Sequence, residues 1–404
     1  MRTVDLFSGC GGMSLGFQSA GYNIVAAFEN WPAAIECYKQ NFKHPVIETD
    51  LSIVDEAIIR IKKYQPDLII GGPPCQDFSN AGNRTEGERA ELTHSFAKII
   101  TAVKPKFFVM ENVARASESE AYKKARKLFI DNGYGLTEIV LDASHCNVPQ
   151  KRNRFFCIGG LNQDDSFLSA ILKAKQTVLP LSVRDYYSEK KYTLEFEYYY
   201  RHPRSYKRRG IFSVDTPAPT IRGVNRPKPS EYKKHDSDPV DPSNIRAMTT
   251  RERARIQTFP DTFVFPENTA NTEQMIGNAV PVQLATFVAS SLSDFVDGKQ
   301  YSCNMQFIDW LKSKKGFTNR AAGDIVSRII RANKIVPIKQ HTGSDYVNKL
   351  DSTKSFKSIK PVVQSQVKRA VRLYFEYLDI STKSDEQNSW KEKPANRQMG
   401  NKRV

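Results

Sequence analysis

The chain has few cysteine and histidine residues and no long hydrophobic run. Its 404 residues include six cysteines and six histidines, with no C-x-x-C pair. This pattern excludes a disulfide framework and indicates no zinc site. No apolar run reaches the roughly 18 residues of a membrane span, and the N-terminus lacks the layout of a signal peptide. We therefore expect a soluble cytoplasmic protein of two or three domains, without metal or membrane contact.

Positive charge is in excess and unevenly distributed. The net charge is +16. Residues 184–235 hold 13 Lys/Arg against 6 Asp/Glu, and residues 298–404 hold 22 against 9, whereas the rest of the chain holds 25 against 29. A slightly acidic body with two basic segments fits a catalytic domain flanked by surfaces that meet a polyanion. The alternative is that the charge serves solubility alone.

A thiol is predicted at the end of a buried strand. The apolar residues 68–70 lead into the segment GGPPCQDFS (71–79). Proline cannot donate to a sheet and glycine permits sharp turns, so the strand must end here and present Cys75. Because ligands bind at the carboxyl ends of strands in open α/β sheets, Cys75 is a candidate nucleophile. The alternative of a small buried cysteine is disfavoured by the polar segment 77–89 that follows.

The first 160 residues alternate between predicted strands and helices, as in a Rossmann-type fold. Strands are expected at 2–6, 23–28, 46–49, 68–70, 107–110, 136–141 and 155–158, and helices at 13–20, 34–42, 53–64, 91–103 and 121–132. The glycine-rich turn 7–12 follows the first strand, where such turns let a ligand approach the backbone. Its spacing is not that of a dinucleotide-binding motif, which argues against a dinucleotide.

Polar residues follow several of these strands. Glu29 and Asp50 are placed to bind a ribose and an exocyclic adenine amine. Phe7 or Trp31 would supply a stacking face for the base. Glu111 is a further carboxylate at a strand end. For each acid taken alone, a solvated loop charge is the alternative.

Two arginines, Arg152 and Arg154, alternate at the entrance of the strand 155–158. The period of two predicts that they point to the same side, where they could bind a phosphate or a base carbonyl. The following residues, 162–245, lose all regular period. They mix arginine, lysine and proline with tyrosines, six of which lie at positions 186, 187, 192, 198, 199 and 200. This composition favours a loop-rich module for nucleic-acid contact, although tyrosines in loops can also be core residues.

Regular patterns return after residue 245. A helix is expected at 248–255 with Thr249 or Thr250 as its cap, and a last helix is expected to open at 277–282 and run to Leu292. Two amphipathic helical patterns follow, at 322–330 and 367–378. We therefore predict a catalytic domain (1–161, completed by 246–297), a recognition domain (162–245), a basic helical extension (298–380) and a disordered tail (381–404).

Six motifs, in order along residues 2–295, resemble those of the DNA cytosine-5 methyltransferases, particularly the bacterial enzymes of restriction-modification systems. They are DLFSGCGG (5–12), GPPCQ (72–76), ENV (111–113), QKRNR (150–154), RExARxQxFP (251–260) and GNAV (277–280). The resemblance implies a Rossmann-like methyltransferase domain with a smaller recognition domain. It also implies S-adenosylmethionine as methyl donor, with S-adenosylhomocysteine as product, and double-stranded DNA as substrate.

The resemblance also implies roles for individual residues. Cys75 would attack carbon 6 of cytosine, Glu111 would bind the exocyclic amine and ring nitrogen 3, and Arg154 would contact the carbonyl oxygen, with Arg152 nearby. The donor site would contain Phe7, Gly9, Gly11, Glu29, Trp31, Asp50, Leu51, Pro73, Asn278 and Ala279. DNA contacts would come from Gln76, Ser79, Thr220 and Arg222.

The expected reaction requires that the cytosine leave the helical stack, because none of its reacting atoms is reachable inside a duplex. Residues 77–89 are then a candidate lid, with glycines at 82 and 87 as hinges. The enzyme is expected to be a monomer in the bacterial cytoplasm, accompanied by a restriction endonuclease without a stable complex. Two alternatives remain: a transfer-RNA methyltransferase, disfavoured by the long basic region, and a non-catalytic DNA-binding regulator, disfavoured by the intact set Cys75, Glu111, Arg152 and Arg154.

Overall fold

The computed structural model describes residues 1–74, 90–177, 179–205, 208–298, 307–336, 338 and 342–389. The chain divides into two compact units, residues 1–299 and 300–404. The candidate nucleophile Cys75, the predicted DNA contacts Gln76 and Ser79, and the predicted lid 77–89 lie outside the described residues.

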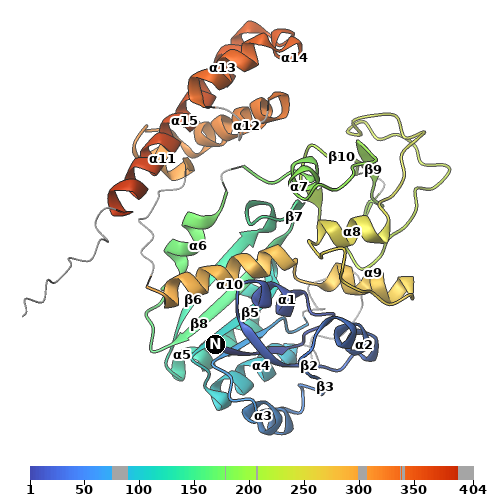
Figure 1. Cartoon of the computed structure of the whole chain (residues 1–404), viewed down its shortest axis with the longest axis vertical. Coiled ribbons are helices and arrows are strands. Elements are labelled where there is room, and N and C mark those ends of the chain that lie inside the picture. Colours follow the sequence, from blue (N-terminus) through green and yellow to red (C-terminus); the bar gives the residue numbers. More distant parts are fainter. Residues whose placement is uncertain are drawn as a thin grey trace, which may run out of the picture. The chain divides into compact units, whose positions relative to one another are not determined.

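A seven-stranded sheet forms the centre of the first unit, in the order β3-β2-β1-β4-β5-β8-β6 (Figure 1). Six strands run in the same direction, whereas β8 runs antiparallel to both of its neighbours, β5 and β6. The seven strands are β1 (Arg2–Leu6), β2 (Asn23–Glu29), β3 (Val46–Glu48), β4 (Leu68–Gly71), β5 (Phe107–Val113), β6 (Tyr134–Asp142) and β8 (Asn153–Leu161). The predicted α/β fold and the predicted strands are confirmed.

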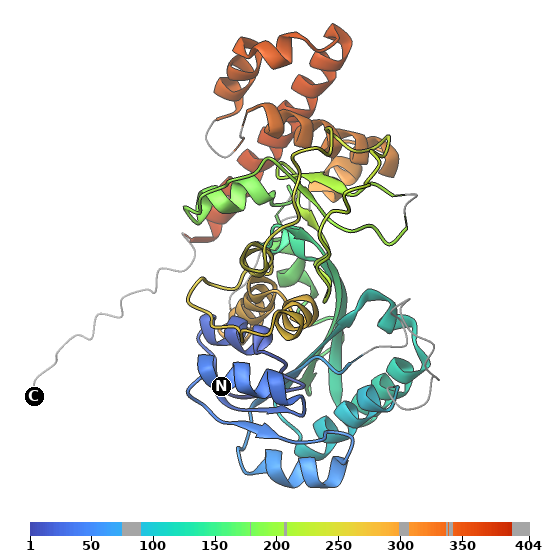
Figure 2. The ribbon, with the colours of Figure 1, turned by 90° about the vertical axis from the view of Figure 1, so that its right-hand side faces the viewer.

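Helices cover both faces of this sheet (Figure 2). They are α1 (Gly12–Ser19), α2 (Pro32–Asn41), α3 (Val54–Lys62), α4 (Ala90–Val103), α5 (Glu120–Asp131) and α10 (Val282–Val296). α1 packs on α10, and α4 packs on α5. In the core beside α4 and α5, Phe96, Phe108 and Phe129 are fully buried. Burial of each such side chain contributes about 1.5–3 kcal/mol, which fixes the sheet that carries the site.

The segment Thr269–Val296 is apolar enough to qualify by composition as a membrane span, yet 61% of its most apolar window is buried in the fold. It forms two helices, α9 (Thr269–Asn278) and α10. Helix α10 is the last helix that residues 277–282 were predicted to open, whereas α9 was not predicted. Pro281 precedes α10, where its missing N–H costs nothing because the first turn of a helix leaves its N–H groups unpaired. The break between α9 and α10 is part of the candidate site, because the carbonyls of Gly277 and Ala279 accept hydrogen bonds from Arg152.

Residues 162–245 share their core with the catalytic part. Their elements are α6 (Ser169–Lys175), α7 (Val183–Glu189), β9 (Tyr198–Tyr200), β10 (Ile211–Ser213) and β11 (Ala218–Pro219). β9 pairs with β10, and β11 pairs with β7 (Gln150–Lys151). Tyr186, Tyr187, Tyr199 and Tyr200 are buried. These four tyrosines are therefore core residues, as the alternative held.

The second unit is helical. Its elements are α11 (Phe307–Ser313), α12 (Asn319–Ile335), α13 (Gly343–Ser352), α14 (Lys354–Lys357) and α15 (Pro361–Ser389). The two predicted amphipathic patterns are α12 and α15, which pack together through buried Ile325 and Ile329 of α12 and Val367 and Val371 of α15. Helix α15 continues to Ser389, past the point where a disordered tail was predicted to begin.

Candidate active site

Parallel strands bring the predicted site residues to one edge of the sheet. Leu6 lies beside Phe28 and Gly71, and Gly71 lies beside Met110, so the four strands end at the same level. The residues at these ends follow one another across the edge in the order Glu29, Phe7, Pro73 and Glu111. With about 4.8 Å between strands, Glu29 and Glu111 are separated by about 14 Å. One ligand can therefore extend along this edge from Glu29 to the neighbourhood of Glu111.

A buried ion pair forms the end of this edge. Arg154 Nε lies 2.8 Å from Glu111 Oε1, and Glu111 is only 8% exposed. In the antiparallel register of β5 and β8, Val113 lies opposite Arg154. Glu111 is two residues before Val113 and so points to the same face of the sheet, where its carboxylate meets Arg154. Burial raises the pKa of Glu111, while Arg154 and Arg152 oppose that increase. Glu111 can thus hold a proton more readily than a carboxylate in water, with a cation positioned beside it.

The chain before Cys75 is held against this carboxylate. A Cβ atom at Gly72 would lie 3.2 Å from Glu111 Oε2, so only glycine lets the backbone pass this close without crowding. Asn112 Nδ2 donates a hydrogen bond to Pro73 O at 3.2 Å. Residues 72–74, which immediately precede the candidate nucleophile, are therefore fixed beside Glu111.

The two predicted arginines have different surroundings. Whereas Arg154 pairs with Glu111, the Arg152 guanidinium donates to three carbonyls, those of Ile221 (3.0 Å), Gly277 (3.0 Å) and Ala279 (3.2 Å). Arg152 is 1% exposed, and its Nε has no partner among the described residues. It therefore joins the recognition region and the α9–α10 break to the strand that carries Arg154.

At the opposite end of the edge, Glu29 orders the glycine-rich turn. Its carboxylate accepts hydrogen bonds from the backbone N–H groups of Gly9 (2.7 Å), Asn30 (3.0 Å) and Trp31 (2.9 Å). Gly9 has a φ of +54°, and a Cβ placed there would meet nothing within 4 Å. The turn thus borders open space at Gly9.

Further predicted donor-site residues lie around the same turn. A Cβ at Gly12 would strike the Val280 carbonyl at 2.5 Å, so the α9–α10 break, with Asn278 and Ala279, lies directly against the turn. Asp50 is exposed just past β3 and accepts from the Ser52 N–H at 2.9 Å, which leaves carboxylate lone pairs available to a ligand. Leu51 is buried and contributes to the core below.

Sequence reasoning missed a buried hydrogen-bonded chain beneath the turn. Ser14 Oγ donates to Asp5 Oδ2 (2.6 Å), Tyr38 OH donates to Ser14 Oγ (2.6 Å), and Tyr38 OH lies 2.7 Å from His44 Nε2. Burial raises the pKa of Asp5 to about 7. A carboxylate inside a strand predicted to be buried was the available signal, because such a group needs a partner.

A second missed network joins distant parts of the chain. Gln150 Oε1 accepts from the Ile221 N–H (2.8 Å), and Gln150 Nε2 donates to Gln257 Oε1 (2.7 Å). Gln257 Nε2 in turn donates to Ala279 O at 3.0 Å. Both glutamines belong to the motifs quoted above, but nothing in their spacing showed that they meet.

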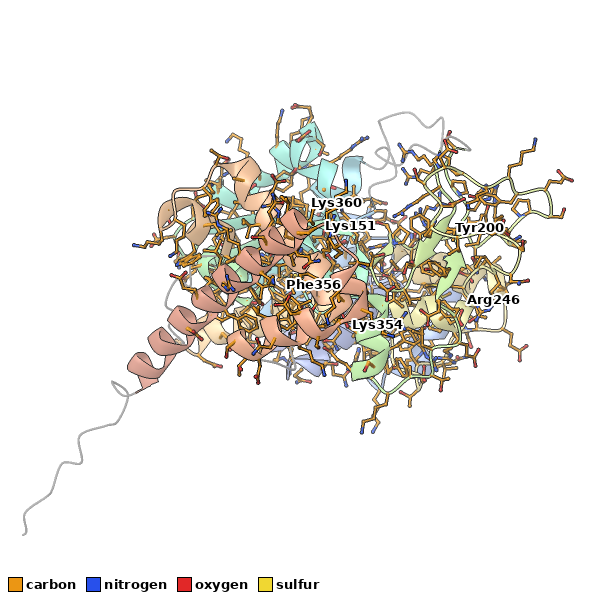
Figure 3. The ribbon with its side chains drawn as sticks, turned by 90° about the horizontal axis from the view of Figure 1, so that it is seen from above. Lys151, Tyr200, Arg246, Lys354, Phe356 and Lys360 are labelled. Carbon is orange, nitrogen blue, oxygen red and sulfur yellow. The ribbon has the colours of Figure 1, made fainter. Side chains whose placement is uncertain are left out.

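The recognition region contains a pocket lined by four arginines, Arg201, Arg222, Arg226 and Arg253, with Tyr200 in its wall. Tyr200 is labelled in Figure 3, where it lies near Arg246, whose carbonyl accepts from its N–H at 2.8 Å. Burial, reinforced by Arg222, lowers the pKa of Arg201 to about 10. Among the described residues, one ion pair is found here, between Arg253 and Glu273. The predicted DNA contact Arg222 lies in this pocket, whereas the hydroxyl of Thr220 donates to Lys151 O.

The fold and this site define an α/β enzyme of the Rossmann-like methyltransferase class. The chain belongs to the C-5 cytosine-specific DNA methylase family, which its residues 1–294 match. Its activity is DNA (cytosine-5-)-methyl transfer, as the first of the three hypotheses held. The predicted family is confirmed.

Individual relatives support this assignment. The chain is 55% identical to the Type II methyltransferase M.HindV of Haemophilus influenzae over 298 residues, which are 73% of this chain and 97% of the relative. It is 53% identical to the Type II methyltransferase M.HgiDI of Herpetosiphon aurantiacus, over 74% of this chain and 96% of the relative. The crystal structure of S. pombe Dnmt2 methyltransferase has the same fold, with a TM-score of 0.55 at 20% identity. The match covers 74% of this chain and 99% of that chain.

Proposed function

We propose that the enzyme methylates carbon 5 of an extruded cytosine in duplex DNA through a transient bond between the Cys75 sulfur and carbon 6. The observation that carries the proposal is the Glu111–Arg154 pair, beside which the chain leading to Cys75 is fixed. Carbon 5 of cytosine is a poor nucleophile by itself. A thiolate added at carbon 6, with a proton supplied at nitrogen 3, converts the ring into an enamine whose carbon 5 is nucleophilic.

Each residue of the pair has a part in that chemistry. Glu111, whose pKa is raised by burial, supplies the proton to nitrogen 3 and accepts from the exocyclic amine. Arg154 holds the carboxylate in place and reaches the base carbonyl, and its charge favours the thiolate form of Cys75. After methyl transfer, loss of the carbon 5 proton and departure of the thiolate restore the aromatic ring.

S-adenosylmethionine, which the family implies, supplies an electrophilic methyl group. Glu29 and Asp50 would bind its nucleoside part, with Phe7 or Trp31 against the adenine face. Asn278 and Ala279 would lie near its methionine part, because the α9–α10 break abuts the glycine-rich turn. The separation of about 14 Å between Glu29 and Glu111 leaves room for a donor whose methyl group faces the cytosine.

DNA would be bound through the arginine pocket of the recognition region, with residues 77–89 closing over the extruded base. Because its relatives are Type II methyltransferases, the enzyme serves as the modification enzyme of a restriction-modification system. It would act as a monomer in the bacterial cytoplasm, without a stable complex with a cognate endonuclease.

Duplex DNA containing 5-fluorocytosine tests the mechanism, because fluorine at carbon 5 prevents the elimination that frees the enzyme. We expect a covalent adduct, stable in denaturing gel electrophoresis, with the wild-type enzyme and donor. Cys75→Ser should form none and should lose methyl transfer, while still binding DNA. An adduct with the variant would refute the proposal. Transfer RNA offered in parallel should remain unmethylated.

A further inference from the structure

Residues 300–404 lie beyond the part of the chain that matches the family, and they carry a segment of one sign of charge. Between residues 352 and 375 there are six Lys/Arg and no Asp/Glu. This segment spans α14 and the first half of α15. We call Lys354, Lys357 and Lys360, together with Arg369 and Arg372 on α15, the basic corner.

The turn between α14 and α15 is rigidly built. Phe356 is fully buried, and Gln364 Nε2 donates to Lys357 O (3.2 Å) and Ile359 O (2.7 Å), which ties the two helices together. Figure 3 shows Lys354 and Lys360 on either side of Phe356. The buried ring and the glutamine thus hold the lysine-bearing backbone in one conformation, so that little ordering entropy is lost when a ligand binds.

The lysines of the basic corner differ from others in the same unit. Lys312, Lys315 and Lys368 form ion pairs with Asp309, Glu376 and Asp351. Lys354, Lys357 and Lys360 are exposed, and in the described part of the chain no carboxylate pairs with them. Like charges gathered without acids repel one another, and an external polyanion relieves that repulsion.

We propose that the basic corner binds the phosphate backbone of duplex DNA, without base selectivity, and so increases the affinity of the methyltransferase for its substrate. DNA is the polyanion on which this enzyme acts. The exposed hydroxyl of Ser355 lies between Lys354 and Lys357 and can donate to a phosphate oxygen, whereas Ser358 Oγ already donates to Ser355 O. The proposal rests on DNA being the substrate, but not on the role of Cys75.

The test is a triple substitution, K354Q/K357Q/K360Q, in the full-length enzyme. Loss of three phosphate contacts should raise the Kd for duplex DNA about ten-fold or more at 0.1 M salt, and should reduce the slope of log K against log salt by about 2–3. Both changes should be equal for substrate and unrelated duplexes. Methyl transfer at saturating DNA should be unchanged, as should adduct formation with 5-fluorocytosine DNA.

Two controls make the result specific. K106Q/K123Q/K127Q removes the same net charge from lysines that already pair with Asp67, Glu120 and Asp131, and should keep the wild-type slope. The charge-retaining variant K354R/K357R/K360R should also keep the wild-type slope. If the slope of log K against log salt were unaltered in the glutamine variant, the proposal would be overturned. The basic corner would then be a candidate binding surface for an acidic protein. A slope that fell equally in the matched control would also overturn it, because net charge alone would then explain the affinity.

Discussion

Two regions of the methyltransferase unit concentrate arginine, and they do so in opposite ways. At the sheet edge, Arg154 pairs with a carboxylate and Arg152 with three carbonyls, so each charge has a fixed partner. In the recognition pocket, Arg201 and Arg222 donate to the carbonyls of Thr220 and His202, but no carboxylate in the described structure pairs with them. Both regions are basic, but two arginines share the Glu111 carboxylate at the sheet edge, whereas the four arginines around the pocket share one, that of Glu273.

The difference separates chemistry from affinity. A charge pair held in a buried site acts on bond-making, because it is already oriented when the substrate arrives. An unbalanced cluster attracts a polyanion and is neutralised by binding it, with a dependence on salt that a buried pair does not have. Substitutions in the two regions should therefore affect different measured quantities.

The largest effect on methylation is expected at the sheet edge. Glu111→Gln keeps the shape of the side chain but cannot transfer a proton to nitrogen 3, so the single-turnover rate of methyl transfer should fall about 10²–10⁴-fold. Binding of S-adenosylmethionine, measured by calorimetry, should change by less than about three-fold, since Glu111 lies away from the donor pocket. Equal losses in rate and in donor binding would instead make Glu111 a structural residue.

A smaller effect, of another kind, is expected in the recognition pocket. R222Q/R226Q should weaken duplex binding about ten-fold and reduce the salt slope by about 2, with little change in the rate at saturating DNA. The matched control R60Q/R126Q removes two arginines that already pair with Glu56 and Glu138. A pocket variant that lowered the saturated rate as Glu111→Gln does would abolish the distinction between the two regions.

The smallest effect on methylation is expected at Asp5, which lies beneath the glycine-rich turn and should act on stability. Because burial raises its pKa from 3.8 to about 7, the folded protein holds a proton between these values that the unfolded chain releases. The free energy of unfolding should therefore fall as pH rises from 4 to 7, by up to about 4 kcal/mol. Asp5→Asn removes this contribution, so thermal unfolding of the two proteins should differ in pH dependence. If the thermal stability of the two proteins depended on pH in the same way, Asp5 would be ionised in the folded protein over this pH range.

Much of the fold could be predicted from local patterns. Apolar runs ending in glycine, proline or acid located the strands. Of the two candidate caps, Thr249 and Thr250, the structure has Thr249, which forms a capping box with Glu252. Residues 277–282 were correctly predicted to open the last helix, α10, but the helix α9 before them was not predicted. The tyrosines were harder, because whether a tyrosine is buried depends on elements that pack from elsewhere in the chain.

The site, too, has residues that the sequence predicted and residues that it did not. Residues that follow parallel strands must meet at one edge, so the grouping of Glu29, Phe7, Pro73 and Glu111 followed from strand order alone. The networks around Asp5 and Gln257 could not be foreseen, because each includes partners more than 20 residues apart in the chain whose approach is set by packing.

The sequence by itself determined the chemistry: a cysteine after a buried strand, a carboxylate after the next, and the motifs of a cytosine methyltransferase. Only the tertiary structure decided what each arginine does. Arg152 and Arg154 are equivalent in spacing, yet one meets Glu111 and the other meets carbonyls supplied from residues 221, 277 and 279. Side-chain period fixes direction along a strand, whereas the partner found there depends on which distant segments the folded chain brings to that place.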